Sequence, residues 1–170
     1  MAFESRLSPA RSNGGVLGSH GGLVKKENFV SEIINAETRG LFVSYAKRSP
    51  ESGFVISAAN GPSEDPVWKI NAIAVDWIFY KEKSFAGDCD SDRVKIDDIM
   101  NDLLGSKIIA FRVSDNGRIR IIFSEDRYVD ITIPNADDDL YWVIGRVERW
   151  ILAFGRDGMR FTDLGRVRGL

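Results

Sequence analysis

The 170-residue sequence contains one histidine, one cysteine and no long apolar run, and each scarcity excludes a class of protein. His20 lies in a glycine- and serine-rich stretch, whereas a catalytic imidazole needs a rigid supporting shell. Cys89 cannot form an internal disulfide, which argues against a secreted, disulfide-stapled scaffold and favours a reducing cytoplasm. Because no uncharged apolar run approaches the roughly 20 residues that span a bilayer, we expect a soluble, cytoplasmic protein without membrane contacts.

Basic residues are too few for a general nucleic-acid binder, because 23 Lys and Arg face 25 Asp and Glu, giving a net charge of −2. The acidic residues are concentrated in the middle of the chain, where residues 49–144 hold eighteen of them against ten basic ones. The run Asp137, Asp138 and Asp139 belongs to this segment. It is a candidate surface for steering a basic protein partner, although a solvated loop that maintains solubility is the simpler interpretation.

No motif for metal or cofactor binding has the required spacing. Residues 88–92, Asp-Cys-Asp-Ser-Asp, imitate the start of a calcium loop, but Arg93 replaces the required glycine and Ile99 the bidentate glutamate. The same carboxylates should raise the thiol pKa of Cys89, which opposes a nucleophilic role. We therefore predict no catalytic residue, metal or cofactor. A metal-dependent enzyme that uses paired carboxylates is retained as an alternative, and its candidate residues are Asp76, Glu82, Asp126 and Asp130.

Composition divides the chain into a glycine-rich, flexible arm over residues 1–22 and a single domain over residues 23–170. Apolar spacing predicts a short helix over residues 25–36. A second helix is expected over residues 88–104, with Gly105 ending it. This second helix should be capped by Asp90 or Ser91, should bury a stripe that includes Val94, Ile96, Ile99, Met100, Leu103 and Leu104, and should turn Asp97, Asp98 and Asp102 to water.

Period-two alternation predicts the strands of an antiparallel sheet. Residues 41–46 and 54–58 should form a hairpin, and residues 67–80 a buried central strand. The alternation breaks at residues 72–74, which indicates either a bulge or two separate strands. From Lys107 to Asp163 the pattern is typical of a β meander, in which Asn116-Gly117 favours a type I′ turn. The meander strands are expected at residues 107–113, 118–123, 128–133, 149–154 and 159–162.

Aromatic and basic residues are interleaved near the end of the sequence and allow two interpretations. They could form a stacking platform for single-stranded nucleic acid, or the tryptophans could fill the core while the arginines face water, which is the interpretation we favour. Trp142 and Trp150 are also our candidate anchors for a protein partner. The whole set comprises Trp142, Arg146, Arg149, Trp150, Phe154, Arg156 and Arg160.

Four segments in the second half of the sequence form a recognisable pattern: Leu103-Leu104-Gly105 to Val113, Arg118 to Phe123, Tyr128 to Ile131, and the pair Tyr141-Trp142 after an acidic loop. This pattern resembles small bacterial β-rich domains. Some of those domains are regarded as toxin-immunity proteins. The resemblance covers about residues 103–160 and rests mostly on core positions. It implies a toxin-neutralising role and carries no functional residues across.

Together these patterns predict an α+β fold: a largely antiparallel sheet of six to eight strands with one or two packed helices and a flexible N-terminal arm. The function we expect is a non-enzymatic protein-binding module, with an immunity-type inhibitor as its most concrete form. The alternatives are a structural component of a larger phage, viral or cellular complex, and the carboxylate enzyme. A homo-oligomer is compatible with either binding role.

Overall fold

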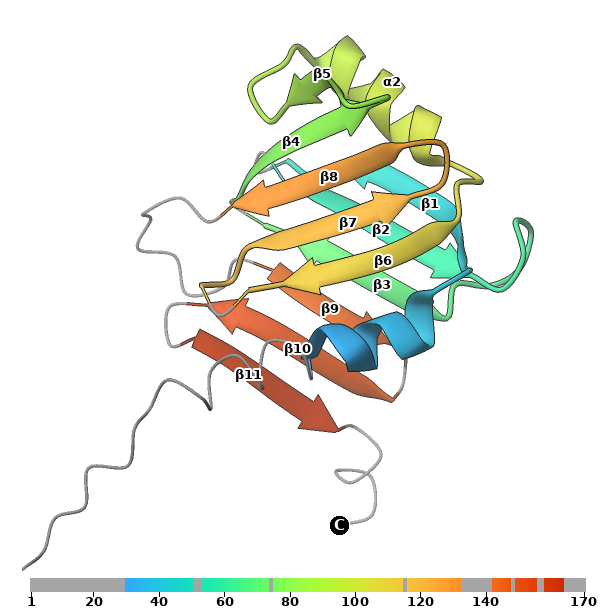
Figure 1. Cartoon of the computed structure of the whole chain (residues 1–170), viewed down its shortest axis with the longest axis vertical. Coiled ribbons are helices and arrows are strands. Elements are labelled where there is room, and N and C mark those ends of the chain that lie inside the picture. Colours follow the sequence, from blue (N-terminus) through green and yellow to red (C-terminus); the bar gives the residue numbers. More distant parts are fainter. Residues whose placement is uncertain are drawn as a thin grey trace, which may run out of the picture.

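Apolar side chains at every second position build two layers of antiparallel strands (Figure 1). This computed structural model describes residues 30–50, 53–73, 75–114, 116–132, 142–147, 149–155 and 158–163, with the backbone alone for residues 150 and 158–163. In this part of the chain, six strands form one sheet in the order β1 (Phe42–Arg48), β2 (Phe54–Ala59), β3 (Trp68–Ala72), β9 (Trp142–Arg146), β10 (Trp150–Gly155) and β11 (Gly158–Asp163). Five strands form the other, in the order β5 (Ser84–Asp88), β4 (Asp76–Lys81), β8 (Arg127–Thr132), β7 (Ile119–Phe123) and β6 (Ile108–Val113).

The inner faces of the two sheets make one hydrophobic core. Trp68 and Phe111 meet across the layers with ring centroids 4.9 Å apart, and Phe54 meets Trp77 edge to face at 5.8 Å. A single cluster of buried residues extends from Ile34 to residues of β10. The α+β class expected from the sequence is thus confirmed, with more strands than the six to eight predicted.

The predicted strand over residues 67–80 is two strands in different sheets. β3 pairs with β2 and β9, whereas β4 pairs with β5 and β8. The break in alternation near residues 72–74 therefore marks the place where the chain crosses from one layer to the other. Of the two explanations that the sequence allowed, two strands is the correct one.

The predicted meander is also divided between the layers. Its first three strands, β6, β7 and β8, lie in the five-stranded sheet, and the hairpin of β10 and β11 lies in the six-stranded sheet. The prediction of one continuous meander was wrong because alternation reports which side chains are buried and carries no information on the sheet that a strand joins. Strands β9 and β5 were not predicted, because Gly145 and Gly87 interrupt the apolar pattern of these short segments.

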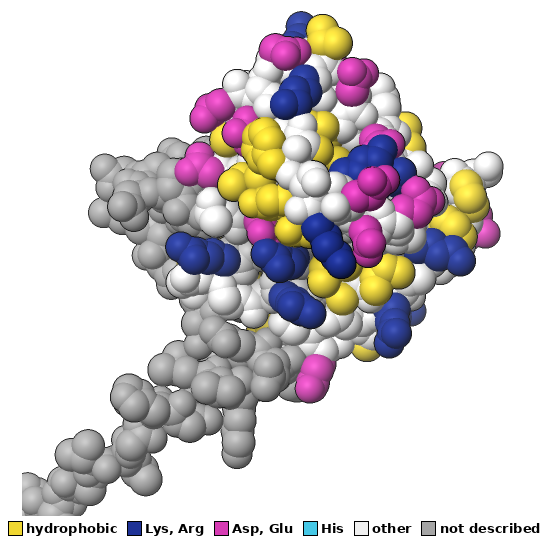
Figure 2. Space-filling view, turned by 45° about the horizontal axis from the view of Figure 1, so that its top comes forward, with side chains coloured by type: hydrophobic (Ala, Val, Ile, Leu, Met, Phe, Trp, Pro, Cys, Tyr) yellow, Lys and Arg dark blue, Asp and Glu magenta, His cyan; other side chains and the backbone are white. Residues whose placement is uncertain are grey.

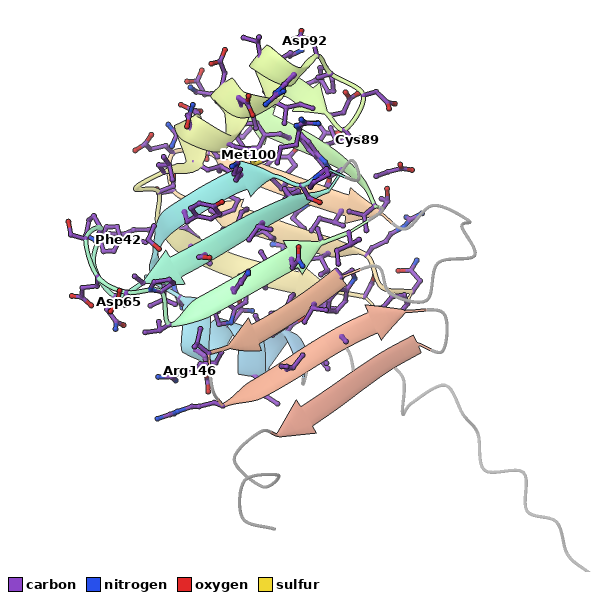
Figure 3. The ribbon with its side chains drawn as sticks, turned by 180° about the vertical axis from the view of Figure 1, so that it is seen from behind. Phe42, Asp65, Cys89, Asp92, Met100 and Arg146 are labelled. Atoms are coloured by element: carbon purple, nitrogen blue, oxygen red, sulfur yellow. The ribbon has the colours of Figure 1, made fainter. Side chains whose placement is uncertain are left out.

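Helix α2 (Arg93–Leu103) lies against β1 and β5, one edge strand of each sheet, so it closes one side of the two layers (Figure 1). The N-cap is Asp92, which follows the two predicted caps Asp90 and Ser91 and accepts a hydrogen bond from the backbone N–H of Lys95 at 2.9 Å. Figure 3 places Asp92 at the start of α2 and Met100 where the helix approaches β1. Gly105 follows the C-cap with φ = +78°, as predicted.

Two residues depart from the predicted buried stripe, and one departs from the predicted solvent-facing side. Val94 and Leu104 are exposed, whereas Ile96, Ile99, Met100 and Leu103 are buried as predicted. Asp102 does not face water alone: it pairs with Lys81 at 3.1 Å and with Arg127 at 3.3 Å. Arg127 also donates to the Ser106 hydroxyl at 2.7 Å, so the end of α2 is fastened to β8.

The chain is helical over residues 30–38, which confirms the described part of the helix predicted at 25–36. This helix runs beside the edge strand β6. The Asn35 side chain accepts from the Phe111 N–H at 2.5 Å and donates to the Phe111 carbonyl at 2.9 Å, and Ser31 accepts from the Val113 N–H at 3.1 Å. These side chains occupy backbone groups that another strand could otherwise bind.

The turn between β6 and β7 is not the predicted type I′ turn. Of the Asn116-Gly117 pair only Gly117 has a positive φ, +77°. The Gly117 N–H donates to the Ser114 carbonyl at 2.9 Å, and the Ser114 N–H donates to the Arg118 carbonyl at 2.9 Å. This pattern is a three-residue loop with glycine in the left-handed position. The hairpin was predicted correctly and its loop length was not.

Candidate binding face

The side of the five-stranded sheet that points away from the other layer carries a mixed aromatic, apolar and charged surface, here called the outer face. Along β8, Val129 and Ile131 point into the core, whereas Tyr128, Asp130 and Thr132 point outward. The same alternation operates in β4, β7 and β6. The outward side chains considered below are Ile78, Tyr80, Arg112, Arg118, Arg120, Ile122, Tyr128, Asp130 and Thr132.

Pairing register arranges these side chains in rows across the sheet. Tyr80 lies opposite Tyr128, which lies opposite Ile122, so this row is aromatic and aliphatic. The next row contains Asp130 opposite Arg120. In Figure 2, hydrophobic side chains gather on the front of the molecule, and dark-blue Lys and Arg side chains lie directly below them.

Tyr128 is held between two neighbours. Its ring stacks on Tyr80 with centroids 4.6 Å apart and an interplanar angle of 14°, while the Arg120 guanidinium lies 4.7 Å from its centroid. Because the ring separation matches the spacing of neighbouring strands, about 4.8 Å, the rings stack along the sheet and present their edges to solvent. Both faces of Tyr128 are therefore occupied.

The guanidinium of Arg120 is fixed by Asp130. Nε donates to Oδ1 at 2.5 Å and Nη2 donates to Oδ2 at 2.6 Å, a bidentate pair. The hydrogen bond to Asp130 raises the pKa of Arg120 above its ordinary value, against a smaller opposing effect of burial. Since the Arg120 side chain is 42% exposed, the pair contributes mainly to orientation, because solvent screens its energy.

An open hollow of about 410 Å³ adjoins this pair at the end of the sheet where β6 and β7 connect. Among the described residues, its charged lining is Arg112, Arg118, Arg120 and Asp130, and Ser114 and Thr132 add hydroxyl groups. Arg112 lies directly opposite Arg120, and like charges in that position repel. Among the described residues, Arg112 and Arg118 have no carboxylate partner.

Trp142, one of the two aromatic anchors predicted from the sequence, does not lie on this face. Trp142 is completely buried, its Nε1 donates to the Gly117 carbonyl at 2.9 Å, and its ring stacks on Phe154 at 5.7 Å. It is therefore a core residue that links β9 to the other layer, and the prediction of an anchor was wrong. The Trp150 side chain and Asp137, Asp138 and Asp139 lie outside the described residues.

A second residue of the predicted nucleic-acid platform also has a structural contact. Arg146, at the end of β9, pairs with Glu37 of the helix over residues 30–38 at 3.0 Å (Figure 3). Its charge fastens that helix to the six-stranded sheet. The interpretation that the aromatic side chains fill the core is thus correct for Trp142.

Cys89 and its acidic neighbours have structural roles. Burial chiefly raises the pKa of the Cys89 thiol, with smaller contributions from Asp90, Asp76 and Asp88 against a lowering hydrogen bond from the backbone of Trp77. The Asp88 carboxylate accepts from the Ser91 hydroxyl at 2.8 Å, so the calcium-like run forms a helix-capping loop. In the described parts of the chain, no group of three or more His, Cys, Asp or Glu side chains is placed to hold a metal ion.

The sequence could not predict that the residues of the outer face form one surface, although the alternation of polar and apolar residues in each strand was visible. Arg118, Arg120 and Ile122 alternate with core residues, as do Tyr128 and Asp130. The sequence shows that these side chains share a solvent-facing side of their own strands. Only the register between strands shows that the arginines meet one another beside a tyrosine stack.

No described helix is long and apolar enough to cross a membrane. Comparison of the chain with protein-family models, with curated proteins and with solved structures gave no match.

Proposed function

We propose that this protein is a non-enzymatic binding module and that its outer face contacts another protein. The observation that carries the proposal is the row Tyr80, Tyr128 and Ile122 beside the arginines of the hollow. Tyrosine and arginine are enriched where proteins bind one another, because each combines a large apolar body with hydrogen-bonding groups. In the described part of the chain, both helices lie at the sides of the layers and leave this face open (Figure 1).

The arrangement of the rings favours a protein over a nucleic acid. A base-stacking platform needs an aromatic face turned to solvent. The faces of Tyr128 are covered by Tyr80 and Arg120, so ring edges and hydroxyl groups are what a partner meets. The net charge of −2 also gives no general attraction to a phosphate backbone.

A narrower form of the proposal is an immunity-type inhibitor of a bacterial toxin. It comes from the resemblance of residues 103–160 to small bacterial β-rich domains. It predicts that the partner is a toxic protein and that binding lowers its activity. The expectation of a basic partner rests on Asp137, Asp138 and Asp139 and stays a prediction, because those residues lie outside the described part of the chain.

Site-specific photocross-linking in the producing cell tests the proposal. A benzophenone amino acid replaces Ile122 on the outer face, and the matched control replaces the exposed Lys69 on the six-stranded sheet. We expect a discrete, protease-sensitive adduct from position 122 and none from position 69. No adduct at 122, equal adducts at both positions, or a nuclease-sensitive adduct would contradict the proposal. Light scattering that gives a large assembly would favour the structural alternative instead.

A further inference from the structure

We propose that the hollow beside the tyrosine row is an anion-binding site that receives the carboxylate side chains of an acidic segment on the partner protein. This inference rests on the proposed function and identifies the chemistry of the partner. Three guanidinium groups, those of Arg112, Arg118 and Arg120, line one hollow, and among the described residues of its lining Asp130 is the single carboxylate. An arginine cluster of this kind recognises carboxylate or phosphate oxygens through paired N–H donors.

Among the described residues of the hollow, the ion pair of Arg120 with Asp130 leaves the positive charges of Arg112 and Arg118 without a carboxylate partner. Asp130 is fully engaged by Arg120 through two hydrogen bonds. Arg112 lies opposite Arg120 in the neighbouring strand, where a like charge costs stability, and Arg118 is exposed two residues before Arg120 on the same side. A bound carboxylate reduces the repulsion between these guanidinium groups, so binding recovers the electrostatic free energy that the repulsion costs the unbound sheet.

The Arg120–Asp130 pair gives the site a fixed wall. Its guanidinium is held by two bonds on one side and by the Tyr128 ring on the other. The exposed Arg112 and Arg118 flank it and can adjust to a ligand. The site thus combines one oriented cation with two adjustable ones.

The form of the hollow favours a carboxylate attached to a protein chain. The hollow is open to solvent, so it does not bury a free small anion, whose own hydration competes with the arginines. The neighbouring row of Tyr80, Tyr128 and Ile122 supplies contact area to the chain that carries the carboxylate. Tyr80 and Arg120 occupy the faces of Tyr128, so this ring offers nucleobases no free face on which to stack.

Nuclear magnetic resonance titration of the whole chain with a capped hexaglutamate peptide tests the site. We expect the peptide to shift the Nε–H signals of Arg112, Arg118 and Arg120, with an affinity that falls as salt rises. The double variant R112Q/R118Q should bind about tenfold more weakly than the wild type. The variant K69Q, which removes one exposed charge from the other sheet, should bind as the wild type does. Unchanged thermal unfolding verifies that each variant is folded.

Three outcomes would overturn the inference. The peptide could bind equally to R112Q/R118Q and K69Q, or inorganic phosphate could shift these signals while the peptide does not, or a hexathymidylate could bind more tightly than the peptide. The cross-link from position 122 separates this inference from the proposed function. If R112Q/R118Q retains that cross-link in full, the binding face stands and the acidic-segment assignment fails; loss of the cross-link in the double variant supports both.

Discussion

Replacing Asn35 by alanine should destabilise the protein strongly for a residue that is only half-buried. Its side chain supplies an acceptor at 2.5 Å and a donor at 2.9 Å to the two backbone groups of Phe111, a residue that is 1% exposed. Leaving a buried backbone group without a partner costs about 1–3 kcal/mol, and water can replace part of the loss here. Alanine returns about 0.5 kcal/mol through its higher helix propensity. We expect a net loss of about 2–4 kcal/mol.

Urea unfolding followed by circular dichroism measures this loss. With an m value of about 2 kcal/mol per molar for a domain of this size, the midpoint should fall by about 1–2 M. The control E32A changes an exposed residue of the same helix and should stay within about 0.5 kcal/mol of the wild type. If N35A unfolds at the same urea concentration as E32A, the two hydrogen bonds between Asn35 and Phe111 do not stabilise the edge of β6.

Three shorter predictions concern other parts of the fold. K83G should raise the free energy of unfolding by about 0.5–1 kcal/mol in urea, because Glu82 and Lys83 both have left-handed φ values, +50° and +63°, in the turn between β4 and β5; a decrease would contradict this. W142F should lower the free energy of unfolding by about 1–3 kcal/mol, because it leaves the Gly117 carbonyl without its donor, and an unchanged thermal midpoint would refute that role. Cys89 should react with iodoacetamide at pH 8 more slowly in the folded protein than in urea, because burial raises its thiol pKa and keeps it protonated, so equal rates would show that the thiol is not protected.

Local sequence patterns predicted most elements, because the spacing of apolar residues within each strand or helix shows which of its sides is buried. The α2 stripe and Gly105 are examples, as is the hairpin of β1 and β2. The error at Val94 arose because the helix begins only at Arg93, and the side chains that it buries are those of Ile96, Ile99, Met100 and Leu103.

The candidate face was less accessible to sequence reasoning than the fold. Trp142 was chosen for its size and its arginine neighbours, but large aromatic residues also fill cores, and here Trp142 is entirely buried. The residues that do meet at the surface, such as Arg112 and Arg120, are separated by a hairpin and become neighbours only through register. Register depends on loop length, which the three-residue loop at Gly117 shows was misjudged.

The division of the strands between the layers determines when the protein can fold during synthesis. β3 is synthesised early, but one of its partner strands, β9, is synthesised late. β4 likewise pairs with β8, which is synthesised after it. A nascent chain that ends before Trp142 therefore leaves the backbone N–H and C=O groups on one edge of β3 without their partner strand. We therefore expect the six-stranded sheet to be completed only after β9, β10 and β11 have left the ribosome.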